Sequence, residues 1–405
     1  MPAAPPAVPR PRSLVPAVCG GLLGAGALAV VAAWVPGAAG KAPARPGGGP
    51  DRTAVEVSPG GCGTGWSRPH AGMQDFALRN TSATAADVRL QDARTGAVFG
   101  ETEGLGPGTV RELRARLGPG AYTFVCLHED ADAVTGPTVR IGGAAAAGGP
   151  AAVPVTRHDL IPPALDYQRW VARRLDGLVA RTDALSAAVA AGDRDAARAA
   201  WLSAHLGYAR LGAAYGAFGA AGEAVDRTTA GLPGGVHDRR FTGFHRVEYG
   251  LWHGESGPGL RRAAQRLAAD VRTLRAQGDR ARMDPADLPR RAHEILEDAF
   301  RQELTGRADY GSGTGLATVR ADVDGTRAVL ARLRPLLSSR YADLPLLDRR
   351  LDGFGRTLEA HRRGGTWTPP RRLARADRER IDAGLGDLLE HLADVAALCE
   401  PRRTA

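Results

Sequence analysis

Residues 167–198, with the sequence YQRWVARRLDGLVARTDALSAAVAAGDRDAAR, decide how most of the chain folds. Their apolar residues recur every three or four positions, which places them on one face of a helix. The residues on that face are Val171, Leu175, Leu178, Thr182, Leu185 and Val189. Gly192 and Asp193 are typical of a helix end, so the pattern predicts one long helix that stops near Gly192.

The same spacing continues toward the C-terminus. It predicts a second helix whose buried face holds Trp201, Ala204, Tyr208, Leu211, Tyr215 and Phe218. Two late stripes repeat it, namely Leu344, Leu347, Leu351, Phe354 and Leu358, and then Ile381, Leu385, Leu388, Leu392 and Val395. Asp284 before Pro285 is typical of a helix start, and Gly306 of a helix end. About six to eight helices with short connections would make residues 157–400 an all-α up-and-down bundle.

The part of the chain before this bundle has a different pattern. Turn signals (SPGG, RNTS, ARTG, GLGPG, GPG, VTGP) return roughly every 8–12 residues and separate short runs such as DFALRN, DVRLQD and AYTFVCL. Short strands at that spacing predict a small β-sandwich over residues 53–142. The run IGGAAAAGGPAAVP has no periodicity and little charge, so we expect residues 143–156 to be a linker.

The first 39 residues resemble an export sequence. Arg10 and Arg12 precede an apolar run over residues 14–35, and small residues follow up to Ala39. This order is typical of a signal peptide, and the run is also long enough to remain as an anchor. We therefore expect residues 1–39 to be a signal peptide or an N-terminal membrane anchor. The protein is then expected to be exported to the cell envelope, at the outer face of the membrane or in a periplasm-like space.

Export would place the three cysteines that follow residue 39 in an oxidising compartment. Cys62 and Cys126 bracket one segment and are the natural disulfide pair, whereas Cys399 is expected to be a buried or free thiol. A mononuclear copper site at Cys62, Cys126 and His128 is the alternative. It would need a second histidine, for which only His70 is available in this part of the chain, and no methionine follows Cys126 closely. A disulfide is therefore preferred.

The composition indicates a globular protein and argues against a nucleic-acid partner. Of the 405 residues, 43% are hydrophobic and 24% are charged. The 53 basic residues exceed the 44 acidic ones by +9, and Lys41 is the only lysine. The arginines alternate with aspartate and glutamate, as in DRDAAR and RADRERID, instead of forming one basic stripe. We interpret them as a solvated helical surface.

The most informative segment for chemistry is FTGFHRVEYGLW, residues 241–252. His245 and Glu248 are three residues apart, so on a helix they share a face. An imidazole nitrogen and a carboxylate at that spacing can reach one cation, with other helices or water completing the site. The alternative is a buried His–Glu hydrogen bond that ties two helices together. Tyr208 and His205, on the predicted second helix, either face this site or simply pack in the core.

Motifs of the common enzyme classes are absent from the sequence. The segment lacks the two histidines and the intervening glutamate of a zinc peptidase. We find no nucleophile elbow, phosphate-binding loop or dinucleotide fingerprint. GSGTG, residues 311–315, follows no predicted strand and precedes no lysine, so we interpret it as a plain loop between helices. The sequence therefore favours a binding protein over an enzyme.

FTGFHRVEYGLW closely resembles the GFHRxE signature of the imelysin family, in its EfeO-type branch. Residues 167–198 resemble the first helical hairpin of that family, VDGTRAVLARLRPLL resembles a later helix, and residues 53–141 resemble the cupredoxin-like domain that precedes the bundle. The resemblance implies an exported iron-uptake component that works beside a membrane iron permease and a Dyp-type haem peroxidase. It also implies a metal site at the HxxE pair, here His245 and Glu248.

The chain departs from the family pattern at several positions. Where family members often carry YExxE on the second helix, this chain reads Tyr208-Ala-Arg-Leu-Gly212, without the carboxylates. A polar run rich in histidine and aspartate is replaced by GSGTGLATVRAD. The β domain has AADVRL where paired glutamates are expected, although Glu101 and Glu103 follow in the next segment. These departures imply an altered metal site.

The leading hypothesis is an exported two-domain protein that binds Fe²⁺ or Fe³⁺, or another divalent metal, and passes it to a permease. His245 and Glu248 would be ligands, with Glu223, Asp226 or Tyr208 completing the shell. Binding should weaken below about pH 6.5, because histidine must lose its proton to coordinate. The alternatives are a metal-free envelope scaffold that docks onto the permease or the peroxidase, and, less favoured, a metallopeptidase.

Overall fold

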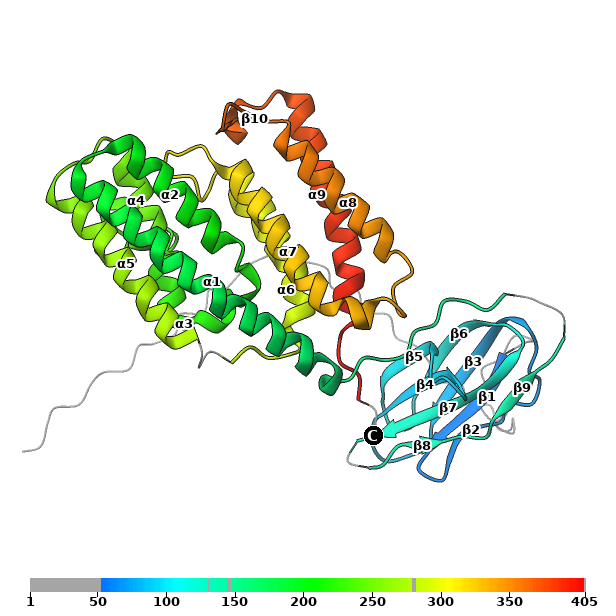
Figure 1. Cartoon of the computed structure of the whole chain (residues 1–405). Helices are drawn as coiled ribbons and strands as arrows, with labels where there is room; N and C mark the ends of the chain where they lie inside the picture. Colours follow the sequence, from blue (N-terminus) through cyan, green and yellow to red (C-terminus); the bar gives the residue numbers. More distant parts are fainter. Residues whose placement is uncertain (1–51, 130, 144–146, 279–281, 404–405) are drawn as a thin grey trace, which may run out of the picture. The chain divides into compact units, whose positions relative to one another are not determined.

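The structure is a computed structural model that describes residues 52–129, 131–143, 147–278 and 282–403. The predicted export segment, residues 1–39, lies outside the described residues. Within them, no helix is both long enough and apolar enough to cross a membrane. Strands fill the first part and helices the second, which confirms the predicted fold class (Figure 1).

The β domain is a sandwich of two sheets. One sheet has the strand order β2-β1-β3-β6, made by β2 (Gly61–Thr64), β1 (Arg52–Ser58), β3 (Gly72–Asn80) and β6 (Val110–Leu117). The other has the order β5-β4-β7-β8, made by β5 (Val98–Leu105), β4 (Ala86–Asp92), β7 (Gly120–His128) and β8 (Val134–Thr135), with β9 (Val139–Ile141) also pairing with β7. β1 runs parallel to β3, while the other pairs are antiparallel.

A disulfide joins the two sheets of this domain. Cys62 on β2 is bonded to Cys126 on β7, with their Cα atoms 5.8 Å apart, so the predicted pairing is confirmed. Both thiols are consumed, which excludes the copper alternative. Beside the disulfide, Phe124 packs edge-on against Phe76 and Trp66 with ring centroids 5.2 and 5.6 Å away. Cys399 is a buried free thiol, as expected.

The helical domain contains nine α-helices among the described residues. They are α1 (Arg157–Ala191), α2 (Arg194–Ala209), α3 (Tyr215–Val225), α4 (Gly243–Trp252), α5 (Pro258–Gly278), α6 (Asp287–Asp298), α7 (Gly315–Leu337), α8 (Leu344–Glu359) and α9 (Arg375–Leu398). Short turns η1 (Gly212–Ala214), η2 (Gly235–His237), η3 (Ala299–Glu303) and η4 (Pro370–Arg372), and a small hairpin of β10 (Arg362–Arg363) and β11 (Thr366–Trp367), connect them.

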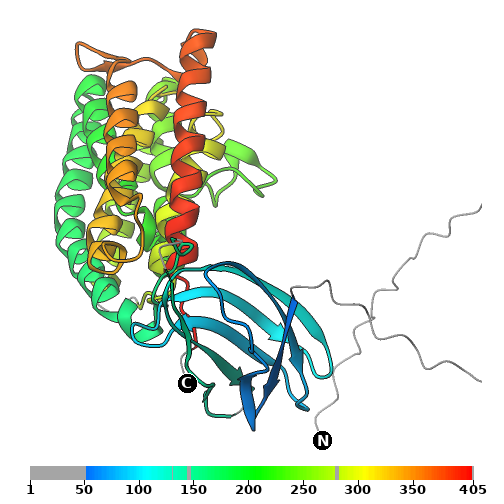
Figure 2. The same cartoon turned by 90° about the vertical axis from the view of Figure 1, so that its right-hand side faces the viewer.

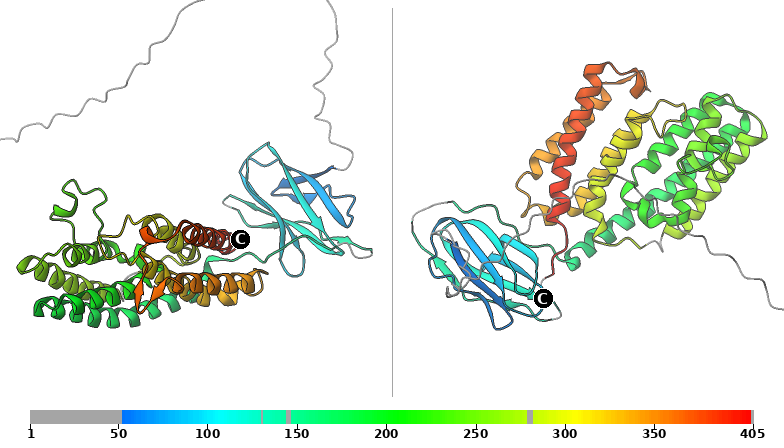
Figure 3. Two further views of the ribbon diagram at one scale, coloured as in Figure 1. Left: turned by 90° about the horizontal axis from the view of Figure 1, so that it is seen from above. Right: turned by 180° about the vertical axis from the view of Figure 1, so that it is seen from behind.

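These helices form two groups that share one hydrophobic core. α1 packs against α2 and α5, and α4 joins them, whereas α6 packs against α7 and α9, with α8 beside α9. The first group is green and the second yellow to red in Figure 3, and Figure 2 shows the long helices running side by side. α7 also contacts α1 and α2, so the groups are joined along α7. A cavity between α2–α4 on one side and α6–α7 on the other therefore lies within the helical domain.

The apolar stripes predicted the long helices correctly. Every residue of the stripes on α1, α8 and α9 is buried. The prediction of one helix through Tyr215 and Phe218 was wrong, because α2 ends at Ala209 and α3 begins only at Tyr215. Gly212 lies in the intervening turn, where a Cβ atom would be 2.9 Å from Cγ1 of Ile295, so the close approach of α6 requires glycine there.

The helix that was predicted to start at Asp284 begins slightly later in the chain, at Asp287. Asp284 is not the N-cap residue, because its carboxylate accepts a hydrogen bond from the amide of Ala286 at 3.0 Å, in a turn just before α6 begins at Asp287. Gly192 does end α1 in the left-handed conformation, with φ 76°.

Candidate metal centre

The start of α4 approaches the end of α3 unusually closely. Gly243 has φ +80°, and a Cβ atom at this position would collide with the backbone carbonyl of Val225. Only glycine tolerates both the positive φ and the contact. The hydroxyl of Thr242 donates to the carbonyl oxygen of Ala224 at 3.0 Å, which fastens the two segments. Asp226, the residue that ends α3, is thereby held beside α4.

A second contact fastens α4 to α2. Nε1 of Trp201 donates to the carbonyl oxygen of Phe244 at 2.9 Å, and both side chains are buried. The ring of Trp201 stacks on His205, one turn later on α2, with 4.8 Å between ring centroids. α2, α3 and α4 therefore bring His205, Asp226 and the segment after Phe244 to one place.

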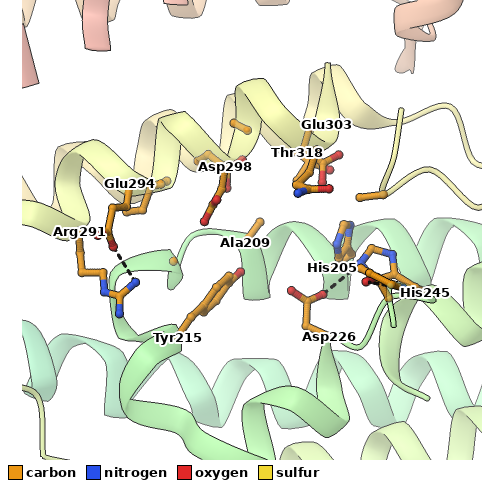
Figure 4. Close-up of a pocket in the computed structure, with 18 residues that line it drawn as sticks. His205, Ala209, Tyr215, Asp226, His245, Arg291, Glu294, Asp298, Glu303 and Thr318 are labelled. Carbon is orange, nitrogen blue, oxygen red and sulfur yellow. Dashed lines mark hydrogen bonds and ion pairs between the residues drawn. The ribbon is translucent and has the colours of Figure 1, made fainter. Parts of the chain in front are cut away.

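His245 lies between two carboxylates. His245 is 3% exposed, with Nε2 at 3.3 Å from Oδ1 of Asp226 and Nδ1 at 3.4 Å from Oε2 of Glu248. The Oδ1 atom of Asp226 is buried and makes no hydrogen bond to any of the described residues. Glu248 therefore orients the imidazole from one side. The other nitrogen of His245 faces Asp226 (Figure 4).

Glu248 is bound mainly by backbone amides. Its Oε1 atom accepts hydrogen bonds from the amides of Tyr310 and Ser312, at 3.0 and 3.1 Å. The GSGTG segment is a loop between helices, as expected, but it is more than a plain connection, because the amide of Ser312 in it binds the buried carboxylate. Asp309 stabilises the loop in turn by accepting from the amides of Gly311 and Gly313, each at 2.9 Å. Glu248 thus acts on His245 and on the loop between η3 and α7.

Three ligand groups meet at this place. His205, Asp226 and His245 each offer one ligand atom, and these atoms lie within 4.8 Å of one another. No other such group of three occurs among the residues that the structure describes. Nδ1 of His205 is buried and has no hydrogen-bond partner among the described residues. We refer to His205, Asp226 and His245 as the triad.

The two histidines of the triad have opposite pKa shifts. Burial, together with the nearby His245, lowers the pKa of His205 to about 4, although Asp226 opposes the shift. This imidazole is neutral at pH 7 and can coordinate without losing a proton. Burial also opposes the charged form of His245, but contacts with Asp226 and Glu248 outweigh it and raise the pKa of His245 well above 6.5.

The triad opens into a cavity of about 340 Å³ between the two helical groups. Figure 4 shows Arg291, Glu294, Asp298 and Glu303 on α6 and η3, facing Tyr215 and the triad from α2–α4. Five carboxylates line the cavity, namely Asp226, Glu294, Asp298, Glu303 and Asp322. The cavity is therefore acidic, and its chemistry suits a cation.

Two imidazoles and one carboxylate are a recognisable set of metal ligands. Mixed nitrogen and oxygen ligands suit iron, and a set of two histidines and one carboxylate leaves other coordination positions open. In this protein the open positions would face the cavity, because His205, Asp226 and His245 all line it. The arrangement fits a metal ion that must be bound and later released, since the cavity leaves room for exchange.

Comparison with known proteins agrees with the fold and with the motif. The family model described as "Imelysin" matches residues 164–393. The chain belongs to the imelysin family. A relative from Yersinia pestis named "Iron uptake system component EfeO" is 27% identical over 328 residues, covering 80% of this chain and 85% of the relative. The protein of the same name from Escherichia coli strain K12 is 25% identical over 327 residues, with the same coverage. The predicted resemblance to the imelysin family is thus confirmed.

The segment matched by the imelysin model contains all the helices around the cavity. The predicted ligands occupy different places relative to this cavity. His245 and Asp226 meet in the triad. Glu248 lies behind His245 and does not line the cavity. Glu223 is exposed and forms an ion pair with Arg227 at 2.7 Å, so it does not reach the site.

Tyr208 is brought near the triad but packs in the aromatic core. Its ring stacks on Tyr215, with centroids 4.6 Å apart, and lies 5.7 Å from the ring of Phe244. Burial raises the pKa of its phenol well above 10, which disfavours the phenolate that a metal would need. In this imelysin domain the tyrosine that lines the cavity is Tyr215.

Four cavity carboxylates were not predicted from the sequence, namely Glu294, Asp298, Glu303 and Asp322. Asp298 and Glu303 occur in a stretch rich in charged residues. In such a stretch, the sequence pattern of a buried carboxylate cannot be distinguished from that of a solvent-exposed acidic face. Asp322 did carry a signal, because it follows Val319 by three residues on a helix whose face is otherwise apolar. A carboxylate at such a position is buried only where it has a function or a partner.

Proposed function

We propose that this protein binds iron at the triad and works as an exported component of an iron-uptake system, passing the ion to a membrane permease. The observation that carries the proposal is the meeting of His205, Asp226 and His245 within 4.8 Å at the wall of an acidic cavity. The name of the EfeO relatives, "Iron uptake system component", supports iron as the ion.

The triad provides both binding and selectivity. His205 is neutral, so it offers an uncharged nitrogen, while Asp226 supplies a hard oxygen and one negative charge. Glu248 accepts from the Nδ1 side of His245 and leaves Nε2 free to face the ion. Carboxylates that contact a ligating histidine in this way fix its orientation and raise its basicity.

Release is expected to be as important as binding. The structure supplies no closed shell of four or more protein ligands among the described residues, because only three groups meet. An ion held by three protein groups and water can be taken over by a partner with stronger ligands. Such a centre fits a carrier better than a permanent structural site.

The test is Fe²⁺ titration under anaerobic conditions, with bound iron counted after gel filtration. The variants are His245→Ala, His205→Ala and a matched control, His253→Ala. His253 follows α4 and is exposed; its Nδ1 atom hydrogen-bonds with the carbonyl oxygen of Tyr249, and its ring stacks on the ring of Tyr249. We expect the tightest equivalent of iron to be lost in both triad variants and retained in the control.

A cellular assay tests the transfer of iron. A host that depends on this protein and its permease for growth at low iron should lose growth with His245→Ala and keep it with His253→Ala. Growth of the His245→Ala strain at the wild-type rate, with unchanged iron content, would favour the metal-free scaffold. If the purified protein hydrolyses peptides, and chelators abolish this hydrolysis, the result would favour the metallopeptidase hypothesis.

A further inference from the structure

The cavity contains more carboxylates than the triad uses. Five carboxylates line it, against one guanidinium, that of Arg291. Arg291 is paired with Glu294 at 2.6 Å, and Asp226 is paired with His245. The other three are Asp298, Glu303 and Asp322. None of these three has an ion pair within 4.0 Å among the described residues.

Asp322 is the decisive member of this set. It is 9% exposed, lines the cavity from α7, and makes no hydrogen bond or ion pair with any described residue. A carboxylate that is buried without a partner costs several kcal/mol if it is ionised. Burial, reinforced by the charges of Glu303, Asp226 and Asp298, accordingly raises the pKa of Asp322 well above 3.8.

We propose that the cavity takes two cations, the first at the triad and a second, hard cation on Asp322 and Glu303. This proposal rests on the proposed function, because both ions enter the same cavity. The second ion neutralises the carboxylates that the protein itself leaves without a partner.

The ligands of the second site are oxygen atoms only. Glu303 ends the π-helical turn η3 and lines the cavity together with Thr318, which lies one turn before Asp322 on α7. Carboxylate and hydroxyl oxygens select hard ions such as Mn²⁺, Mg²⁺ or Fe³⁺ over soft ones. Because, among the described residues, only the triad brings three ligand groups within 4.8 Å, water must complete this second shell. The second site is therefore the weaker of the two.

The charge state of Glu303 agrees with this assignment. Burial raises the pKa of Glu303 to about 8; the charge of His245 opposes the shift, and Asp226 and Glu248 add to it. A cation that binds would displace the proton of Glu303 and gain one carboxylate, whose single negative charge is shared by two oxygens.

The test is a Mn²⁺ titration followed by electron paramagnetic resonance of the free ion, with bound manganese counted separately. The exported protein should bind two equivalents. Asp322→Asn and Glu303→Gln should each bind one, and His245→Ala should lose the tighter equivalent and keep the weaker. Asp324→Asn is the matched control, because Asp324 lies on the same helix but pairs with Arg210 and Arg320. It should retain both equivalents.

Thermal unfolding without metal gives a second measurement. Asp322→Asn keeps the shape of the side chain and removes a buried acid, so its Tm should equal or exceed that of the wild type, while added Mn²⁺ should raise its Tm less. One equivalent in the wild type, or two in Asp322→Asn, would overturn the second site. Two equivalents in the wild type, one in Asp322→Asn and two in His245→Ala would leave the second site standing and refute the triad.

Discussion

Nε2 of His245 lies 3.3 Å from Oδ1 of Asp226, at the point where the first turn of α4 passes the last residue of α3. This contact joins a side chain in the first turn of α4 to the residue that follows α3. It depends on the positive φ of Gly243, because any side chain there would push α4 away from Val225.

Gly243→Ala should therefore separate His245 from Asp226. An alanine at positive φ costs about 1–2 kcal/mol by itself, and the collision with Val225 adds to this. We expect iron affinity to fall more than about tenfold, since a shift of about 1 Å in a ligand is enough to disturb a site of this kind. Urea unfolding and iron competition against a chelator measure the two effects.

Gly254→Ala is the control for this substitution. Gly254 also has a positive φ, +77°, but a Cβ atom there would have open space. It should lose about 1–2 kcal/mol of stability and keep its iron affinity. Equal iron affinities in the two variants would show that the close approach of α4 to α3 does not position the ligands.

Glu248→Gln should weaken iron binding without unfolding the site. The amide oxygen of glutamine can still accept from the amides of Tyr310 and Ser312, whereas the negative charge beside His245 is lost. Substitutions of such supporting carboxylates typically lower metal affinity by about 10–100-fold. Glu248→Ala, which also leaves both amides without an acceptor, should in addition cost about 3 kcal/mol in the free energy of unfolding. Iron binding at the wild-type affinity in Glu248→Gln would contradict the supporting role.

Iron affinity should begin to fall at a higher pH than an ordinary histidine would give. The pKa of His245 is raised above 6.5, so its proton competes with the ion already above that pH, while His205, with a pKa of about 4, adds nothing there. Glu248→Gln removes one of the two carboxylates that cause the shift and should move the midpoint down toward 6.5. Chelator competition from pH 5.5 to 8.5 would show this as a displaced curve.

Stability without metal should have the opposite dependence on pH. A raised pKa in the folded state means that the charged His245 stabilises the fold fully below 6.5, and this contribution is lost as the pH rises through the folded-state pKa. His245→Gln should therefore flatten the dependence of the free energy of unfolding on pH above 6.5. A dependence unchanged by the substitution would assign it to other groups.

Removal of the disulfide should affect the β domain and spare the metal centre. Cys62 and Cys126 are separated by 64 residues, and closing a loop of that length stabilises a fold by about 4 kcal/mol. The double variant Cys62→Ser, Cys126→Ser should unfold its strands at a lower urea concentration, followed by near-ultraviolet circular dichroism. Iron binding by the helical domain should be unchanged, and its loss would connect the two domains functionally.

The sequence predicted the fold more completely than the site. Apolar stripes such as the one through Leu175 and Leu178 on α1 repeat over many turns, and α9 has a similar stripe. Because so much apolar surface must be buried, only one face of each helix can point toward the core. The pairing of Cys62 with Cys126 followed from their places in the β domain. The break in the helix after Ala209 was missed, because the apolar period continues across the turn at Gly212.

By itself, the sequence determined a β-rich part followed by a helical part, the family, and the presence of His245 and Glu248 on one helix face. Only the tertiary structure decided that His205 and Asp226 join His245, that Glu248 supports the site from behind, and that Asp322 faces a cavity. The physical reason is that periodic burial is a property of one helix, whereas a ligand set depends on distances between helices. Those distances are set by local contacts such as Gly243 against Val225, which leave no periodic trace in the sequence.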